Sequence, residues 1–138
     1  MSTETNKAMT RRFYEEVINQ KQLALVDELA ADNLAAHFLP PGLPPGPTGL
    51  KIFLGVFHSA FPNGYLTIDQ MIAEGDTVAT RLTFHGTHTG DFQGIAPTGK
   101  TVTVPALDMV RVVDGKAVEI WGGPNQLSLL QQLGVIPS

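Results

Sequence analysis

The sequence predicts an α+β domain in which helices close one face of a curved, mostly antiparallel sheet. Three observations lead to this prediction. Apolar residues recur with helical spacing in the first half of the chain, and the second half is rich in the residues that favour strands. Residues 114–116 (Asp-Gly-Lys) form a strong hairpin signal between two such runs. The chain has 138 residues, so one domain over residues 1–138 can bury its own core.

The first half of the chain is predicted to be helical. In residues 9–17, apolar side chains recur every four positions between charged ones, which is typical of an amphipathic helix. A second, short helix is expected over residues 23–30. Residues 37–49 contain five prolines and three glycines, so we expect an irregular loop, because proline donates no backbone hydrogen bond. A third helix is expected over residues 50–61, where apolar residues again follow helical spacing.

The second half of the chain is predicted to be a sheet followed by one helix. Four runs rich in Thr, Val, Ile and Leu predict strands at residues 65–73, 77–88, 101–113 and 117–121. Glycine-containing turns at residues 74–76 and 114–116 make their flanking strands antiparallel neighbours. A glycine-rich connection, residues 90–100, joins the second of these strands to the third. The last helix is expected over residues 126–133, ending at Gly134. Helices packed on a curved sheet leave an apolar pocket, a common place for a small-molecule site.

The composition excludes several classes of function. With 9 basic and 13 acidic residues the net charge is −4, which argues against a nucleic-acid partner. No apolar run approaches the ~20 residues that span a membrane, so we expect no membrane partner. There are no cysteines, which excludes disulfides and thiolate metal ligands and fits a reducing cytoplasm. The first 17 residues contain no apolar segment of the kind found in secretory signals.

Several stretches together resemble one known family. Residues 86–100, 110–121 and 127–137 are similar to the SnoaL-like, or ester-cyclase, branch of the NTF2-like superfamily, and residues 13–37 and 44–53 resemble its opening. The resemblance implies a cone-shaped α+β barrel with a deep pocket. It also implies a small-molecule substrate, a homodimer or tetramer, and no metal or cofactor. Family members include polyketide cyclases that close a ring by intramolecular aldol chemistry, and relatives include limonene-epoxide-hydrolase-like enzymes and terpenoid cyclases.

Asn125 occupies the position at which the resemblance implies a catalytic aspartate. A carboxamide cannot exchange protons as a carboxylate does, but it can donate and accept hydrogen bonds. Asn125 is therefore expected either to cap the final helix only, or to cap it and contact a ligand as well. The family often has a histidine before Trp121, where this chain has Ile120. Both differences put the standard aldol mechanism in question.

His37 and Asp108 are the other candidate catalytic residues. By analogy with the family, His37 lies near the pocket, where an imidazole is a natural base at neutral pH. Its alternative role is a hydrogen bond that anchors the proline-rich loop. Asp108 is an acid within an apolar strand, and burial in the pocket would raise its pKa and make it a plausible base. The alternation does not decide which face Asp108 occupies, and an outward position would make it structural.

Arg81, Trp121, Phe53 and Phe57 are the candidate substrate-binding residues. Arg81 shares one strand face with Thr83, where epoxide-hydrolase relatives carry an arginine and an aspartate. It either binds an oxyanion or forms a structural ion pair. The aromatic residues either line a pocket for a flat ligand or belong to the core.

The sequence thus predicts a cofactor-independent enzyme for an apolar, oxygenated, polyketide- or terpenoid-like substrate, with cyclisation or related lyase or isomerase chemistry. The alternative is a ligand-binding protein without activity, in which Asn125 marks the lost acid. Epoxide hydrolysis ranks third, because the two carboxylates that it needs are absent at the matching positions.

Overall fold

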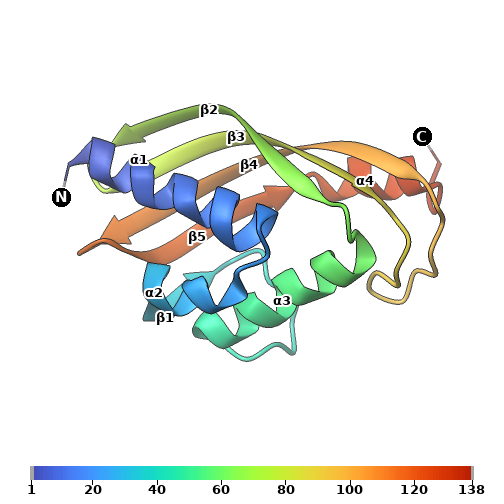
Figure 1. Cartoon of the computed structure of the whole chain (residues 1–138), viewed down its shortest axis with the longest axis horizontal. Helices are drawn as coiled ribbons and strands as arrows, with labels where there is room; N and C mark the ends of the chain where they lie inside the picture. Colours follow the sequence, from blue (N-terminus) through green and yellow to red (C-terminus); the bar gives the residue numbers. More distant parts are fainter. Residues whose placement is uncertain (1, 138) are drawn as a thin grey trace.

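The strands of the protein form a five-stranded sheet in the order β1-β5-β4-β3-β2 (Figure 1). The computed structural model describes residues 2–137. β1 pairs with β5 in parallel, and the other neighbours are antiparallel. The strands are β1 (Ala30–Ala36), β2 (Tyr65–Glu74), β3 (Thr77–Thr87), β4 (Thr101–Val113) and β5 (Lys116–Pro124). The α+β class predicted from the sequence is confirmed, as are the positions of the last four strands to within three residues.

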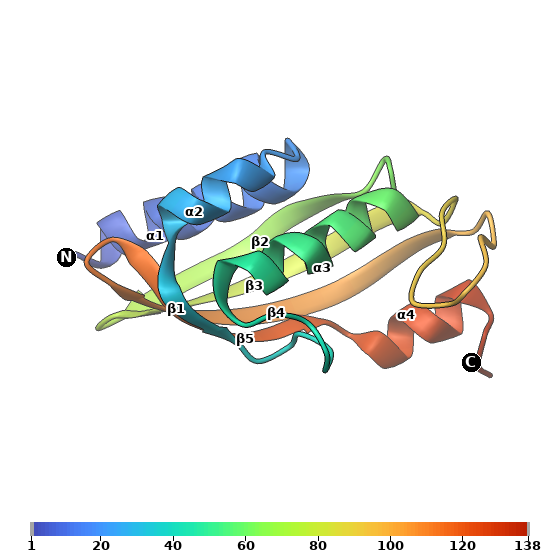
Figure 2. The ribbon, with the colours of Figure 1, turned by 90° about the horizontal axis from the view of Figure 1, so that it is seen from below.

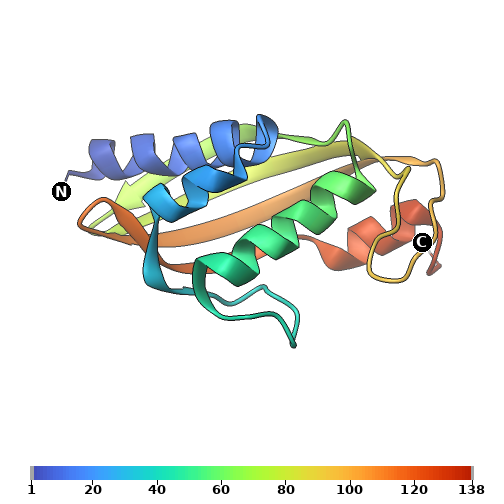
Figure 3. The ribbon, with the colours of Figure 1, turned by 60° about the horizontal axis from the view of Figure 1, so that its bottom comes forward.

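The helices cover the inner face of this sheet. Figures 2 and 3 show α1, α2 and α3 on the same side of the strands, while α4 lies beside the start of β4. The helices are α1 (Thr3–Arg12), the π-helix η1 (Phe13–Asn19), the short 3-10 helix η2 (Leu23–Leu25), α2 (Val26–Leu29), α3 (Gly46–Ala60) and α4 (Gln126–Leu133). Among residues 2–137, no helix is long and apolar enough to cross a membrane.

β1 is an element that the sequence did not predict. A helix was expected over residues 23–30, but α2 ends at Leu29 and β1 begins at Ala30. The segment Ala-Ala-Asp-Asn-Leu-Ala-Ala has few residues that favour strands, and Leu34 is the large apolar side chain that it buries. Its partner β5 comes more than eighty residues later, so tertiary pairing, rather than local propensity, makes this segment a strand.

Strict alternation sorts the residues of β3 and β4 between two faces. Even-numbered residues from Val78 to Phe84 and from Val102 to Ala106 are buried against the helices. Odd-numbered residues face away from the helices, on what we call the outer face of the sheet. The predicted strands therefore have an inner face that belongs to the core and an outer face that does not.

A cluster of phenylalanine rings fills the space between α3 and the sheet. Phe57 lies within 6 Å, centroid to centroid, of the rings of Phe53, Phe61, Phe84 and Phe92. Phe92 comes from the glycine-rich connection between β3 and β4, so this loop is fixed to the core.

His88 holds the other end of the same loop. Its backbone N–H donates to the Lys100 carbonyl over 2.9 Å, and its ring Nδ1 accepts from the Thr98 N–H over 3.2 Å. His88 is fully buried.

Candidate active site

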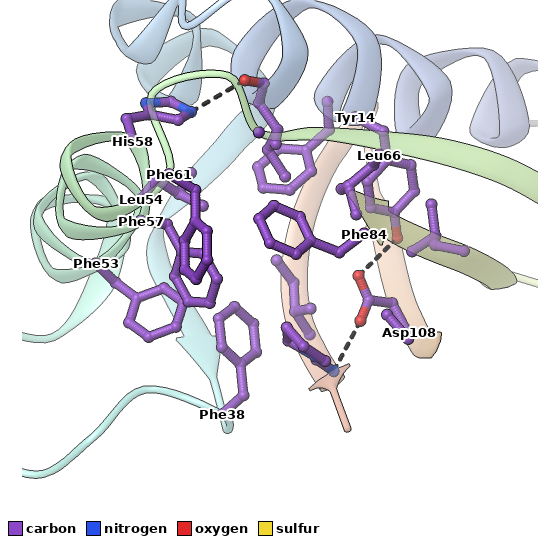
Figure 4. A pocket seen from close by; sticks show the side chains of 18 of the residues that line it. Tyr14, Phe38, Phe53, Leu54, Phe57, His58, Phe61, Leu66, Phe84 and Asp108 are labelled. Atoms are coloured by element: carbon purple, nitrogen blue, oxygen red, sulfur yellow. Dashed lines mark hydrogen bonds between the residues drawn. The ribbon is translucent and has the colours of Figure 1, made fainter. Parts of the chain in front are cut away.

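A pocket lies between the inner face of the sheet and the helices η1 and α3 (Figure 4). Its wall is mainly aromatic and aliphatic. Six of the lining residues are the phenylalanines Phe13, Phe38, Phe53, Phe57, Phe61 and Phe84. Phe53 and Phe57 therefore line this pocket and also pack in the core, so the two roles considered for them coincide.

Asp108 is the carboxylate in this pocket. It lies at an even position of β4 and so points inward, which settles the orientation that the sequence left open. Its Oδ2 accepts a hydrogen bond from the hydroxyl of Tyr14 over 2.9 Å, and its Oδ1 accepts from the backbone N–H of Gly123 over 2.8 Å (Figure 4). A half-buried acid and a buried phenol are thus in direct contact.

The surroundings shift the pKa values of both groups. Burial raises the pKa of Asp108 above its ordinary value, although the hydrogen bonds from Tyr14 and Gly123 act in the opposite direction. Burial and the neighbouring Asp108 carboxylate raise the pKa of Tyr14 well above its ordinary value. An acid whose pKa moves towards neutrality in an apolar pocket is suited to proton transfer.

Tyr14 was missed by the sequence analysis because its position depends on a π-helix. Residues 9–17 predict a regular helix, whereas the chain widens into η1 from Phe13 to Asn19. Widening of this kind changes which side chains share a face, and π-helical turns are frequent at functional sites. Phe13, Tyr14 and Ile18 all line the pocket from this segment. The feature of the sequence that could have indicated Tyr14 is a polar aromatic side chain next to the apolar positions 9, 13 and 17.

Two glycines at the end of β5 bring a backbone donor to Asp108. Gly122 and Gly123 both have positive φ angles, of 112° and 116°. A Cβ atom on Gly122 would lie 1.9 Å from the carbonyl oxygen of Leu107. Only glycine therefore fits where β5 passes β4, and this path directs the Gly123 N–H at the carboxylate.

His58 lies on α3 beside the pocket and is half-buried. Its Nε2 donates to the carbonyl oxygen of Ile18 over 3.0 Å, which joins α3 to η1 (Figure 4). Desolvation lowers the pKa of His58. The imidazole therefore acts as a neutral hydrogen-bond donor between the two helices.

Asn125 does not line the pocket. It caps α4, where its Oδ1 accepts from the Ser128 N–H over 3.0 Å, and its side chain is exposed. The cap expected from the sequence is confirmed. The residue that supplies a carboxylate to the pocket is Asp108 on β4.

His37 and Trp121 also lie outside the pocket. The ring of His37 stacks on Trp121 with a centroid distance of 5.5 Å, and its Nε2 is 2.7 Å from Oε2 of Glu119. Hydrogen bonds from His37 and Arg111 lower the pKa of Glu119. The four side chains form a polar cluster where β1 meets β5. Here His37 fixes the start of the proline-rich loop, the structural role considered for it.

Arg81 faces away from the pocket, on the outer face of the sheet. Its guanidinium is 3.9 Å from the carboxylate of Asp69, which also accepts a hydrogen bond from Thr83 over 2.6 Å. Arg81 and Thr83 therefore lie on the opposite side of the sheet from the Asp108 side chain. The ion pair considered from the sequence is the arrangement found.

Within residues 2–137, no group of three or more His, Asp or Glu side chains is arranged to hold a metal ion. The polar side chains that line the pocket are those of Tyr14, His58 and Asp108.

Comparisons with known proteins identify what the chain is similar to. The profile of the SnoaL-like polyketide cyclase family matches residues 8–133. No curated protein matches the sequence significantly.

Several solved structures have the same fold over nearly the whole chain. An inferred polyketide cyclase from Bacillus cereus is 32% identical, with a TM-score of 0.83, over 99% of this chain and 87% of that one. IdmH, an inferred polyketide cyclase from Streptomyces antibioticus, is 31% identical, with a TM-score of 0.81, over 94% and 98%. TsrD from Streptomyces laurentii reaches a TM-score of 0.89 at 23% identity, over 99% of both chains. These likenesses confirm the NTF2-like fold expected from the sequence.

Proposed function

This chain belongs to the SnoaL-like polyketide cyclase family, and we propose that it is an enzyme that closes or rearranges a ring in an apolar, oxygenated, polyketide- or terpenoid-like substrate. The observation that carries the proposal is the contact between Asp108 and Tyr14 inside an aromatic pocket. A pocket without such a group could bind a substrate, but it could not exchange a proton with it.

Asp108 is the proposed catalytic residue. Because burial raises the pKa of Asp108, its carboxyl is protonated more readily than that of an ordinary aspartate, which suits a group that gives a proton to the substrate and takes one back. Cyclisation by isomerisation needs both transfers. Because the rest of the wall is largely apolar, a substrate that fills it would displace water and hold its reacting carbons close together.

Tyr14 is proposed to hold the carboxylate in place and to donate to it when Asp108 has lost its proton. Its hydroxyl is 2.9 Å from Oδ2, and the Gly123 N–H fixes Oδ1. The two oxygens thus have separate partners, and the carboxylate plane is defined. We assign Asn125 only its role as the cap of α4.

The test is product analysis by mass spectrometry on a panel of polyketide esters and terpenoid epoxides. The native protein should convert at least one compound to an isomer. Asp108→Asn, which keeps the shape of the side chain, should lower kcat by about 100-fold or more, since positioned acid–base groups contribute 10²–10⁴-fold. Tyr14→Phe should have a smaller effect.

Asn125→Ala is the matched control, because it changes a polar side chain outside the pocket. It should reduce stability by about 1 kcal/mol through loss of the cap but leave kcat within about threefold. If Asp108→Asn turns over as fast as the native protein, the assignment of the acid is wrong. If the native protein binds a compound of the panel but converts none, the chain is a binding protein, the alternative that the asparagine at position 125 favours.

We also propose that the chain forms a homo-oligomer through the outer face of its sheet. An apolar row crosses this face in register, from Ile72 through Ala79 and Met109 to Trp121. Ile72 is 59% exposed and Met109 is 45% exposed, so the row is uncovered in a single chain. Uncovered apolar surface of this kind is typical of protein interfaces.

A further inference from the structure

The charge of the pocket has one sign. Asp108 is its acidic residue, and among the described residues that line it there is no lysine or arginine. The rest of the wall is dominated by phenylalanine rings, whose faces carry partial negative charge. None of these described lining residues offers a fixed positive charge to an anion.

The polar hydrogens that Tyr14, His58 and Gly123 bring to the pocket wall are directed at protein acceptors. The hydroxyl of Tyr14 and the N–H of Gly123 both donate to Asp108. Nε2 of His58 donates to the Ile18 carbonyl, since a carbonyl oxygen can only accept. A negatively charged oxygen on the substrate would therefore find these donors occupied, and it would lie close to a carboxylate whenever Asp108 is ionised. Arg81, which could have neutralised such an oxygen, is on the other face of the sheet.

We propose that ring closure in this pocket passes through a positively charged form of the substrate, produced when protonated Asp108 gives its proton to a substrate carbonyl oxygen. This inference rests on the proposed function, because both use Asp108 as the acid. Aromatic faces attract a cation within about 6 Å, most strongly when water is excluded. The carboxylate that Asp108 becomes would be the counter-ion.

The step balances without an oxidant, a reductant or a second reactant. The proton moves from the Asp108 carboxyl to the carbonyl oxygen, and the substrate gains one positive charge. An enol carbon of the same molecule then attacks the carbonyl carbon, a carbon–carbon bond forms, and the electron pair of the C=O π bond moves to the protonated oxygen. The former enol is now a protonated ketone, which returns its proton to the Asp108 carboxylate. The product is an isomer of the substrate.

The test compares three probes of the same shape: benzyltrimethylammonium, its carbon isostere neopentylbenzene, and the anion 2,2-dimethyl-3-phenylpropanoate. The ammonium ion imitates the charged intermediate, and the hydrocarbon imitates the uncharged ground state of the substrate. Binding is measured by NMR titration, where protons held over ring faces shift upfield. We expect the ammonium ion to bind at least tenfold more tightly than the hydrocarbon, and the carboxylate to bind most weakly.

Two variants locate the source of this preference. Asp108→Asn should reduce the preference for the ammonium ion to threefold or less, with binding of neopentylbenzene nearly unchanged. Phe38→Leu removes a half-buried ring of the wall and should weaken the binding of the ammonium ion more than that of the hydrocarbon. This second variant tests the inference even if Asp108→Asn does not fold.

The inference is overturned if the carboxylate binds best, if the ammonium ion binds no better than the hydrocarbon, or if no probe binds. An Asp108→Asn protein that keeps the full preference overturns it too. These outcomes are separable from the proposed function. If the protein isomerises a substrate but prefers the anion, the proposed enzymatic activity stands and the cationic route is wrong. If it prefers the ammonium ion but converts no substrate, the pocket binds cations and the proposed enzymatic activity is wrong.

Discussion

Asp108 shows how a single residue couples the pocket to stability. Carboxylates in folded proteins are usually exposed or paired with a basic group. Asp108 instead has a phenol and a backbone N–H as partners, and burial raises its pKa. The folded protein therefore holds the Asp108 proton more tightly than the unfolded chain does, and stability depends on pH.

The sign of this dependence follows from linkage. When the pH is below the ordinary pKa of an aspartate, Asp108 is protonated in both the folded and the unfolded state, and its ionisation does not lower the free energy of unfolding. As the pH rises, the unfolded chain releases this proton first, so the free energy of unfolding falls until the pH has passed the raised pKa of the folded state. As far as Asp108 is concerned, the folded protein is thus most stable below the ordinary pKa of an aspartate, and it loses stability as the pH rises through the raised pKa of the folded state.

Asp108→Asn removes this titration. Relative to the native protein, the variant should therefore gain melting temperature between pH 4 and pH 8, because only the native protein is penalised as the pH rises. Thermal unfolding followed by circular dichroism at four pH values checks this. A difference in melting temperature that is constant over this range, or that becomes less favourable to the variant with rising pH, would contradict a raised pKa at Asp108.

Among the elements, η1 and the end of β5 form the site together. The π-helix carries Tyr14 over the sheet, and the two glycines of β5 bring a backbone N–H to the other side of the same carboxylate. Both are departures from regular structure, of the kind that clusters at functional sites.

The close approach of β5 to β4 depends on the glycine at position 122. Gly122→Ala would place a Cβ atom in the path of the Leu107 carbonyl and force alanine into a positive φ. We expect a loss of more than about 3 kcal/mol in the free energy of unfolding, since the conformation alone costs roughly 1–2 kcal/mol. Urea denaturation measures the loss.

Gly94→Ala provides the control for this variant. Gly94 also has a positive φ, of 85°, but a Cβ atom there meets nothing within 4 Å. This substitution should cost only the conformational part, about 1–2 kcal/mol. Equal losses at positions 94 and 122 would mean that the close approach of β5 to β4 has no energetic consequence.

At the scale of the whole molecule, the sheet separates two surfaces with different tasks. Its inner face and the helices enclose the pocket, and its outer face exposes the apolar row from Ile72 to Trp121. Charged pairs border this row, with Arg81 and Asp69 on one side and Arg111 and Glu119 on the other. A second copy of the chain could therefore cover the row without approaching the pocket.

Met109→Lys tests that arrangement, because Met109 lies in the middle of the row and is exposed. The variant should elute as a monomer in size-exclusion chromatography with light scattering, whereas the native protein should have at least twice the mass. Ile52→Lys is the matched control, since Ile52 is 43% exposed but belongs to α3 on the opposite side. A native protein that is monomeric at micromolar concentration, or an equal effect of both variants, would contradict an interface on the outer face.

Much of the fold follows from local patterns in the sequence. The hairpin at residues 114–116, the runs that became β2 to β5, and the helices α3 and α4 all carry their own periodicity or turn residues. The Asn125 cap is likewise a local feature. The NTF2-like fold was predictable because these elements occur in the order of the family that the chain resembles.

The tertiary structure alone decided which candidate residues meet. Asp108 and Tyr14 are 94 positions apart, and their contact depends on the register of β4 and on a π-helix that no local pattern specified. Long-range pairing also made a strand of β1 and placed Arg81, His37 and Trp121 away from the pocket. The sequence by itself determined the order of the elements and the residue types available for chemistry. Which side of the sheet each residue faces was set by how those elements pack, because a strand with apolar residues on both faces does not encode its own orientation.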